Sequence, residues 1–339
     1  MSLRLAISMG DPAGIGPELI VKALAAESRR ANAGWVIVGA DGPLRRAAIA
    51  AGLPPAWRTL PMLIPGAEPK PGEVVLIDDG RGPWNTGPSR EAGQASYAWV
   101  SRAIALAQLR PGDPWRVDGV VTGPISKQAW ALAGHSRYPG HTELFAERFG
   151  VDDFAMMFMS GVMNVILATV HVPLLRVPAL LTTAGVRRAI SLGAASLKAR
   201  GFLSPRIAVC GLNPHAGEEG LLGEEDARVI APAIQAARAL GADVSGPFPG
   251  DTVFLDAIDR PGRPRRFDLV VAMYHDQGLI PFKLLARDEG VNVTVGLPTV
   301  RTSPDHGTAF DIAGKNLADP GSMGAAMDLA IELARRQGH

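Results

Sequence analysis

Short hydrophobic runs rich in β-branched residues alternate along the chain with longer, alanine-rich stretches of helical spacing. The runs predict strands and the stretches predict helices. Strands are expected at residues 3–9, 34–38, 73–77, 119–122, 154–159, 164–168, 206–210, 269–273 and 291–295. Helices are expected at residues 17–26, 42–51, 90–109, 125–133, 142–149, 183–200, 224–240, 252–259 and 323–336. This alternation is typical of an α/β protein with a largely parallel sheet.

The length of the chain indicates two lobes rather than one. Its 339 residues exceed what a single hydrophobic core usually serves. A passage from one lobe to the other near residue 130, with a return near residue 300, would make the first lobe discontinuous. We therefore expect one lobe at residues 1–130 plus 300–339 and the other at residues 131–299.

The composition excludes several classes of protein. Hydrophobic residues make up 47% of the chain, charged residues make up 20%, and the net charge is +1, which argues against a nucleic-acid partner. The basic run at residues 260–266 (RPGRPRR) contains two prolines and is interpreted as a solvated loop. No window approaches the roughly 18 consecutive apolar residues that a membrane span needs, so no membrane partner is expected.

The single cysteine and the first residues indicate a cytoplasmic protein. Cys210 lies in the apolar run RIAVCGL, where we interpret it as a buried filler and not as a nucleophile. One cysteine cannot form a disulfide within the chain, which fits a reducing compartment. The start, MSLRLAISMGD, has only a short apolar run followed by an acidic residue, and it predicts a strand and not a signal peptide.

Three histidines follow three predicted strands. His171, His215 and His275 each come at or after the carboxyl end of a strand, where open α/β sheets bind their ligands. Neutral imidazole is a common ligand of divalent transition metals, and three such ligands leave one position open for a substrate. The alternative is that each histidine caps a helix or makes a local hydrogen bond. Asp251 is a further candidate ligand, or else a helix cap.

The stretch MYHDQGLIPFK at residues 273–283 places polar groups directly after a hydrophobic strand. We expect a turn at Gly278 that brings His275, Asp276 and Lys283 to one place. Asp276 is expected either to orient an imidazole from outside the metal's own ligands or to cap a turn.

A second group of residues is suited to an anionic substrate. Lys283, Asn292 and Arg301 surround the predicted strand at residues 291–295, and lysine and arginine are the usual partners of carboxylate and phosphate. His141 and Thr142, in PGHTE, open a predicted helix whose first N–H groups could face an anion. The alternative for each is a surface charge or a cap.

The loop MGDPAGIGPE joins the first predicted strand to the first predicted helix. Its glycines, Gly10, Gly14 and Gly16, do not have the G-x-G-x-x-G spacing of a dinucleotide fingerprint, and the loop lacks the lysine of a P-loop. The glycines predict either a close approach of another group to this backbone or a purely structural turn.

Several motifs together resemble a known family. The stretch DHGTAFDIAGKNLADP at residues 305–320 resembles the adenine-side cofactor loop of isopropylmalate and isocitrate dehydrogenases. With MGDPAGIGPE, VTGPISK, YPGHTE, GLNPHAGE and YHDQGLIPFK in that order, the whole chain resembles the 4-hydroxythreonine-4-phosphate dehydrogenase family of vitamin B6 synthesis. The resemblance implies two α/β/α lobes flanking a cleft, as in isocitrate and isopropylmalate dehydrogenases. It also implies a homodimer with each active site at the subunit interface.

The resemblance assigns roles to residues of this chain. The implied metal ligands are His171, His215 and His275, with Asp251 near the metal. The implied substrate-binding residues are His141, Thr142, Lys283, Asn292 and Arg301. The implied cofactor-binding residues are His306, Gly307, Thr308, Ala309 and Asn316. The lobe of residues 131–299 would hold the metal, the substrate and the dimer contact, and the other lobe would hold the cofactor.

The implied reaction is an oxidation followed by loss of carbon dioxide. NAD or NADP, with zinc, magnesium, manganese or cobalt, would serve to oxidise 4-hydroxythreonine 4-phosphate at C3 to a β-keto acid, which decarboxylates to 3-amino-2-oxopropyl phosphate. Lys283 and Asp251 are the candidate catalytic residues. The general base stays open between Lys283, a histidine and a water near the metal.

There are three alternatives to this function. Related dehydrogenases act on threonate or erythronate 4-phosphate or on an aromatic cis-dihydrodiol dicarboxylate. A metal-dependent aldolase or hydrolase without NAD would also use three histidines and cationic anchors, but the HGTAFDIAG segment argues against it. A non-catalytic binding protein would not explain three histidines at three strand ends.

Overall fold

The structure, a computed structural model, describes residues 2–337 and divides into two compact units. The first unit comprises the chain up to Asp152 together with the segment from Leu297 onward, and the second comprises Asp153–Gly296. Within residues 2–337, no helix has the length and hydropathy that crossing a membrane requires.

The first unit contains a sheet of parallel strands. In spatial order they are β3 (Arg58–Leu60), β4 (Val74–Asp78), β2 (Gly34–Gly39), β1 (Arg4–Ser8), β5 (Gly119–Thr122) and β12 (Val300–Pro304). The central strands β1 and β2 are buried almost throughout. Helices cover both faces of a parallel sheet, so the side chains on both faces of these strands are buried and their sequences are continuous hydrophobic runs.

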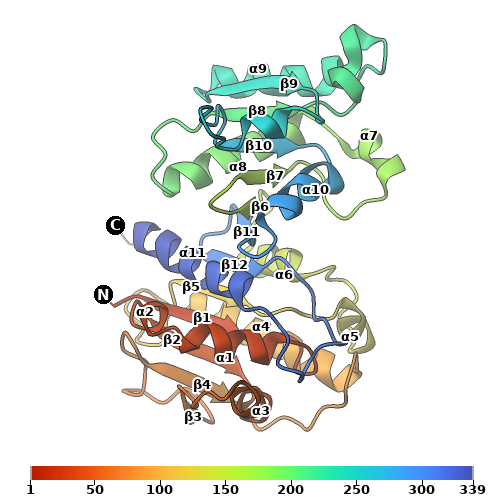
Figure 1. The fold of residues 1–339 in the computed structure, drawn as a ribbon. Helices are drawn as coiled ribbons and strands as arrows, with labels where there is room; N and C mark the ends of the chain where they lie inside the picture. The colour runs from red at the N-terminus through yellow and green to blue at the C-terminus, as the bar shows by residue number, and fades with distance from the viewer. Residues whose placement is uncertain (1, 338–339) are drawn as a thin grey trace. The chain divides into compact units, whose positions relative to one another are not determined.

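Helices of the first unit pack on this sheet and on one another (Figure 1). They are α1 (Gly16–Ala25), α2 (Glu27–Arg30), α3 (Asp41–Ala51), α4 (Arg90–Ala107), α5 (Lys127–Leu132), α6 (His141–Phe149) and α11 (Gly321–Gln337). Helix α4 contacts β1, β2 and β5, while α11 contacts β12 and β5. Pro17 lies in the first turn of α1, where its missing N–H costs nothing.

Helix α6 lies in the first unit, whereas residues 131–152 are predicted from the sequence to belong to the second lobe. The cause is packing against α4 and the residue that follows it. The Gln108 side chain donates to Arg148 O at 2.7 Å, and the Arg148 guanidinium donates to the Tyr97 hydroxyl at 3.1 Å. These contacts link residues about 40 to 50 positions apart, which local sequence patterns do not reveal.

The second unit contains a mixed sheet. Its strands, in spatial order, are β11 (Val291–Val295), β6 (Ala155–Met159), β7 (Asn164–Leu167), β10 (Leu269–Ala272), β8 (Ile207–Cys210) and β9 (Val244–Phe248). Strand β6 is antiparallel to both β11 and β7. Strands β7, β10, β8 and β9 run parallel, so their carboxyl ends meet at one edge.

The helices of the second unit include several short or irregular elements. They are η1 (Leu174–Arg176), α7 (Val177–Leu180), α8 (Thr183–Ala199), η2 (Pro214–Gly220), η3 (Asp226–Ile230), α9 (Ala231–Ala239), η4 (Val253–Asp256) and α10 (His275–Ala286). The helix predicted at residues 224–240 is a π-helical turn, η3, followed by α9. The helix predicted at residues 252–259 is only the 3-10 turn η4.

The turn predicted at Gly278 is wrong, because Gly278 lies inside α10. A Cβ at this position would lie 2.8 Å from Val165 Cγ1 and 2.9 Å from Leu167 Cδ2, so the glycine permits close packing of α10 on β7. The helix buries Leu279, Phe282 and Ala286, which have helical spacing. Asp276 in the first turn favours the helix through its dipole.

The α/β class predicted from the sequence is confirmed. Each unit combines helices with a sheet, and the strands of the first unit are all parallel. The predicted cleft between two lobes stays a prediction.

Candidate functional site

The three predicted histidine ligands follow three adjacent parallel strands of the second unit. His171 comes four residues after β7, His275 three residues after β10, and His215 five residues after β8. The sheet order β7-β10-β8 therefore places His275 on the middle strand. This is the edge at which α/β sheets bind ligands.

His171 and His275 lie next to each other. Their ring centroids are 5.7 Å apart, and both residues line a cavity of about 250 Å³. His275 Nδ1 shares a hydrogen bond with Asp276 Oδ1 at 2.7 Å. His171 has a φ of +23°, which is unusual for a residue with a side chain and is often found at functional sites.

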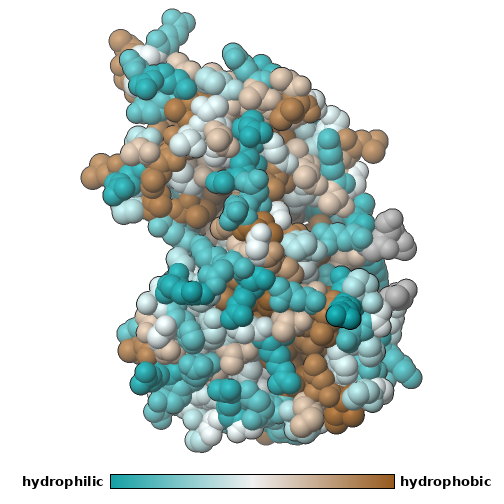
Figure 2. All heavy atoms as spheres, turned by 180° about the vertical axis from the view of Figure 1, so that it is seen from behind, coloured by the Kyte–Doolittle hydropathy of each residue, from teal (hydrophilic) through white to brown (hydrophobic). Residues whose placement is uncertain are grey.

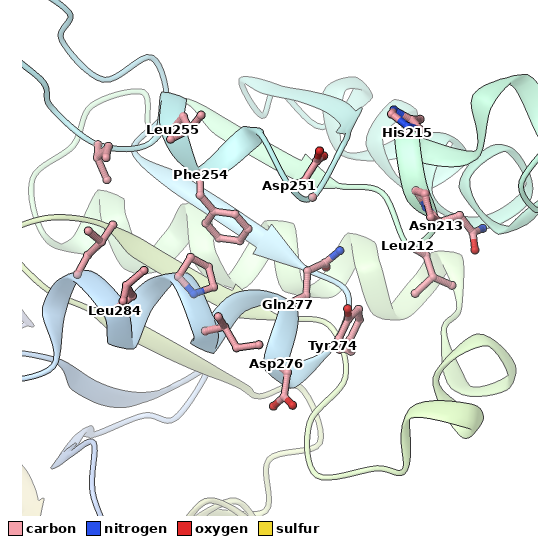
Figure 3. Close-up of a pocket in the computed structure, with 16 residues that line it drawn as sticks. Leu212, Asn213, His215, Asp251, Phe254, Leu255, Tyr274, Asp276, Gln277 and Leu284 are labelled. Carbon is pink, nitrogen blue, oxygen red and sulfur yellow. The ribbon is translucent and has the colours of Figure 1, made fainter.

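His215 and Asp251 line a second, larger cavity of about 790 Å³. Both lie opposite α10, the helix that carries Gln277 and Leu284 (Figure 3). Tyr274 and Asp276 line both cavities, so the two cavities adjoin. His215 belongs to η2, in which residues 215–219 all have positive φ; this left-handed run costs about 1–2 kcal/mol for each residue that is not glycine.

The donor set fits a divalent metal ion in part. Two imidazoles on one tetrahedral zinc, with Zn–N near 2.0–2.1 Å, have ring centroids about 5 Å apart, which is close to the separation of His171 and His275. Within residues 2–337, no three His, Cys, Asp or Glu side chains are already arranged around one point. His171 and His275 therefore fit as two ligands of one metal ion, whereas His215 lines the adjoining cavity.

Gln277, which has no role assigned from the sequence, connects the segment that precedes His275 to the segment that precedes His215. Its Oε1 accepts from Met273 N, and its Nε2 donates to Gly211 O, both at 2.7 Å. Gln277 thereby holds the carboxyl ends of β10 and β8 together. An amide side chain, with both an acceptor and a donor, suits such a position, but the sequence contains no periodic signal for it.

Lys283 and Asn292 also belong to the second unit. Lys283 is exposed on α10, and Asn292 lies on β11 opposite Phe158 of β6. The Asn292 side-chain oxygen is buried and has no hydrogen-bond partner among the described residues. A buried acceptor without a partner indicates a position that a donor could fill.

His141, Thr142 and Arg301 come together in the first unit, around the carboxyl end of β5. Arg301 is 2% exposed. Its guanidinium lies 5.9 Å from the ring centroid of Phe145 and donates to Thr122 Oγ1 at 2.7 Å. Burial lowers the pKa of Arg301 to about 10, so it stays charged at neutral pH. Thr142 is also buried.

His141 is the first residue of α6 and is neutral. Burial lowers its pKa well below the ordinary value, and the cations of Arg301 and Lys127 act in the same direction. Its Nε2 is buried and has no hydrogen-bond partner among the described residues. The site in the first unit therefore offers one guanidinium cation and an imidazole nitrogen without a partner.

The predicted cofactor segment packs against the glycine-rich loop. Ile15 N donates to Thr308 O at 3.0 Å, and a Cβ at Gly14 would lie 2.9 Å from the same oxygen. Of the two interpretations of the glycines, close backbone approach is therefore correct at Gly14. Helix α1 also holds the segment, since Glu18 Oε1 accepts from Gly314 N and Lys22 Nζ donates to Asn316 O.

A cavity of about 410 Å³ adjoins this segment. Ala313 and Gly314 line it together with Gly14, Arg46 and Trp84. Its volume lies within the range of small-molecule sites, and the glycine-rich backbone and aromatic ring suit one end of a dinucleotide. Of the other predicted cofactor residues, His306, Gly307 and Asn316 are exposed, while Ala309 and Asn316 have positive φ.

Comparison with known proteins shows similarity along the whole chain. A family model described as pyridoxal phosphate biosynthetic protein PdxA matches residues 35–330. A 4-hydroxythreonine-4-phosphate dehydrogenase of Desulfosudis oleivorans is 44% identical over 335 residues, 97% of this chain and 96% of that protein. A D-threonate 4-phosphate dehydrogenase of Salmonella typhimurium is 44% identical over 337 residues, 97% of this chain and 98% of that protein.

Solved structures agree with this similarity. The crystal structure of a 4-hydroxythreonine-4-phosphate dehydrogenase from Klebsiella pneumoniae matches with a TM-score of 0.82 at 41% identity. The match covers 98% of this chain and 100% of that chain.

Proposed function

Because the chain belongs to the PdxA family of pyridoxal phosphate biosynthetic proteins, we propose that it is a dehydrogenase that oxidises 4-hydroxythreonine 4-phosphate at C3 with a nicotinamide cofactor. The observation that carries the proposal is identity of 44% over nearly the full length of a relative with this name. The histidines at three adjacent strand ends and the anion-binding residues of the first unit support it.

The proposed reaction has two steps. In the first, NAD or NADP would accept the C3 hydrogen as hydride, and the hydroxyl proton would pass to a base. The resulting ketone is β to the carboxylate. In the second step the C1–C2 bond breaks and carbon dioxide leaves. The electron pair of that bond stays on C2, which takes up one proton to give 3-amino-2-oxopropyl phosphate.

We propose that His171, His275 and His215 hold a divalent metal ion: zinc, magnesium, manganese or cobalt. When bound there, such an ion would act as a Lewis acid that lowers the cost of removing the hydroxyl proton of the substrate. Asp276 fixes the His275 ring through Nδ1. Histidine ligands favour zinc or cobalt over magnesium.

The remaining residues bind substrate or accept protons. Arg301, His141 and Thr142 would hold an anionic group of the substrate, since Arg301 stays charged and His141 offers an unused nitrogen. Lys283 and Asn292 would bind substrate from the second unit. Lys283 and Asp251 are the proposed catalytic residues, and the general base is Lys283, a histidine or a water near the metal.

A second candidate substrate is D-threonate 4-phosphate. The observation in its favour is a relative of that name at the same 44% identity. It differs from the first substrate at C2, where a hydroxyl replaces the amino group. The same two steps would then yield dihydroxyacetone phosphate instead of an amino ketone.

We propose that the protein is a homodimer with active sites at the subunit interface. Helix α10 exposes three large hydrophobic side chains, with Ile280 at 67%, Leu284 at 81% and Leu285 at 45%. Hydrophobic residues also reach the surface among hydrophilic ones on the face drawn in Figure 2. An apolar helix face of this kind is typical of a contact surface.

A cytoplasmic location stays a prediction.

The test is the stoichiometry of the reaction. Metal-loaded protein with 4-hydroxythreonine 4-phosphate and NAD or NADP should form reduced cofactor and carbon dioxide in equal amounts, together with 3-amino-2-oxopropyl phosphate. Cleavage of the substrate without cofactor reduction would instead identify an aldolase or hydrolase. Reduced cofactor without carbon dioxide would contradict the decarboxylation step.

A further inference from the structure

Lys127 begins α5 close to the anion-binding residues of the first unit. Strand β5 ends at Thr122, which accepts the hydrogen bond from Arg301, and α5 starts five residues later. Ser126 caps the helix, since its Oγ accepts from Ala129 N at 3.1 Å. The short connection keeps Lys127 near the carboxyl end of β5.

Packing fixes the orientation of α5. A Cβ at Gly93 would lie 2.0 Å from Ala129 O, so α4 and α5 are in close contact. Trp130 is fully buried, donates to Ser96 Oγ at 3.0 Å and meets the His141 ring edge-on with centroids 5.8 Å apart. Lys127 precedes Trp130 by three residues and shares its helix face. Lys127 therefore lies on the side of α5 that faces His141.

The charge of Lys127 is not compensated. Among residues 2–337 its ammonium takes part in no hydrogen bond or ion pair, and the side chain is exposed. Its charge acts on His141 in the same direction as that of Arg301. Two cations beside a neutral imidazole repel each other mildly, and a bound anion would convert this repulsion into attraction.

The amino-terminal end of α6 adds further positive potential. Its N-cap residue, Gly140, provides no side-chain oxygen to the first N–H groups. A helix N-terminus carries roughly half a positive charge and suits phosphate. Glu143, in the first turn of α6, raises the pKa of Arg301 and so offsets part of the positive charge.

We propose that Lys127 binds the phosphate group of the substrate together with His141, Thr142 and Arg301. This inference rests on the proposed function for the identity of the substrate. A phosphate monoester carries about −1.5 to −2 charges at pH 7, which matches two cations and a helix N-terminus better than a carboxylate with one charge does. Lysine suits this role because it binds phosphate as a point charge.

The test compares Lys127→Met, which keeps most of the side-chain volume, with Lys127→Arg, which keeps the charge. Lys70→Met, at an exposed lysine on a loop elsewhere in the same unit, is the control. We expect Lys127→Met to raise KM for the phosphorylated substrate at least tenfold and to change kcat less than threefold. The inhibition constant for inorganic phosphate should rise by a similar factor. Lys127→Arg and Lys70→Met should stay within about threefold of wild type.

Binding without turnover separates this inference from the proposed function. Calorimetry with inorganic phosphate and NMR titration of His141 in ¹³C-histidine protein need no substrate. Lys127→Met should weaken phosphate binding and raise the pKa of His141, since one of the cations that lower it is gone. If wild type turns over no candidate substrate, the proposed function fails, and these two measurements still decide the role of Lys127.

Two results would overturn the inference. One is a Lys127→Met variant with unchanged KM and unchanged phosphate inhibition. The other is an equal loss of affinity for a substrate analogue without the phosphate, which would assign Lys127 to the carboxylate.

Discussion

The hydrogen bond between His275 Nδ1 and Asp276 Oδ1 leaves Nε2 as the ring nitrogen for a metal ion. Carboxylates in this position fix the tautomer and orientation of a ligating histidine, and their loss typically costs tenfold to a hundredfold in metal affinity. The sequence predicted this role for Asp276 as one of two alternatives, because the two residues are adjacent. The distance of 2.7 Å favours the orienting role.

Asp276→Asn should therefore weaken zinc or cobalt binding about tenfold to a hundredfold. The amide keeps the size of the side chain but does not accept as strongly from an imidazole N–H. Calorimetric titration of metal-free protein is the measurement. Asp288→Asn, at an exposed position after α10, is the control and should bind metal as wild type does. Equal affinity for Asp276→Asn and wild type would refute the orienting role.

A second prediction concerns Asp11, which is fully buried in the glycine-rich loop. Burial raises the pKa of its carboxyl from 3.8 to about 6, opposed by the hydrogen bond from Ala13 N. The folded protein keeps the proton between these two pH values, whereas the unfolded chain releases it. Stability is therefore lost as the pH rises through this window, and the difference corresponds to about 3 kcal/mol at pH 7.

Asp11→Asn should accordingly raise the free energy of unfolding at pH 7 by about 1–3 kcal/mol. The amide still accepts from Ala13 N, but it cannot ionise. Urea unfolding at pH 7 and pH 4 is the measurement, with the exposed Asp152→Asn as the control. The gain in the free energy of unfolding should nearly vanish at pH 4. If Asp11→Asn is instead less stable than wild type at pH 7, the charged form of Asp11 is stabilised by a contact.

At the scale of elements, α10 shows how tertiary packing overrides a local signal. Gly278 and Pro281 interrupt the sequence of this helix, which is why the sequence predicted a turn. The helix forms because Leu279, Phe282 and Ala286 are buried against the sheet, with the rings of Phe282 and Phe158 5.6 Å apart.

Gly278→Ala should destabilise the protein by about 1–3 kcal/mol, because the added methyl overpacks the contact with Val165 and Leu167. The better helix propensity of alanine, about 1 kcal/mol, offsets only part of this cost. Gly42→Ala in α3 is the control, since its Cβ would meet only Arg46 NH1 at 3.5 Å. The free energy of unfolding in urea is the measurement, and a stabilised Gly278→Ala variant would contradict the packing argument.

Most buried strands were predictable because they are short hydrophobic runs, and their ends differ from the prediction by at most one residue. The missed strands lack that signature. Strand β3 (RTL) is largely exposed, β9 (VSGPF) contains glycine and proline, and β12 (VRTSP) is mostly polar although it is buried. In β12 the sheet buries Arg301, Thr302 and Ser303, and nothing local in the sequence indicates this.

Part of the candidate site was also predictable from the sequence. Histidines at strand ends are visible as soon as the strands are predicted, and the structure places those strands side by side. The spatial pairing of Gln277 with Gly211, and of Lys127 with the His141 site, depends on packing between segments far apart in the sequence.

At the scale of the whole molecule, the apolar face of α10 gives the most direct test of the proposed homodimer. Leu284→Asp places a charge on a side chain that is 81% exposed in the single chain. A charge at the centre of an apolar interface should shift the protein to monomers and reduce activity with it. Light scattering after size-exclusion chromatography is the measurement.

Leu203→Asp, at a leucine that is 96% exposed elsewhere in the second unit, is the control and should leave the oligomeric state unchanged. A Leu284→Asp variant that has the wild-type mass in solution would place the interface elsewhere or exclude a dimer.

The central claim is that this chain oxidises and decarboxylates a phosphorylated 3-hydroxy acid. The most direct test measures kcat/KM of the metal-loaded protein for 4-hydroxythreonine 4-phosphate, D-threonate 4-phosphate, erythronate 4-phosphate and an aromatic cis-dihydrodiol dicarboxylate, with NAD and with NADP. The account predicts reduced cofactor with a phosphorylated substrate and the highest kcat/KM for 4-hydroxythreonine 4-phosphate. Turnover of the dicarboxylate alone, or of none of the four, would contradict it.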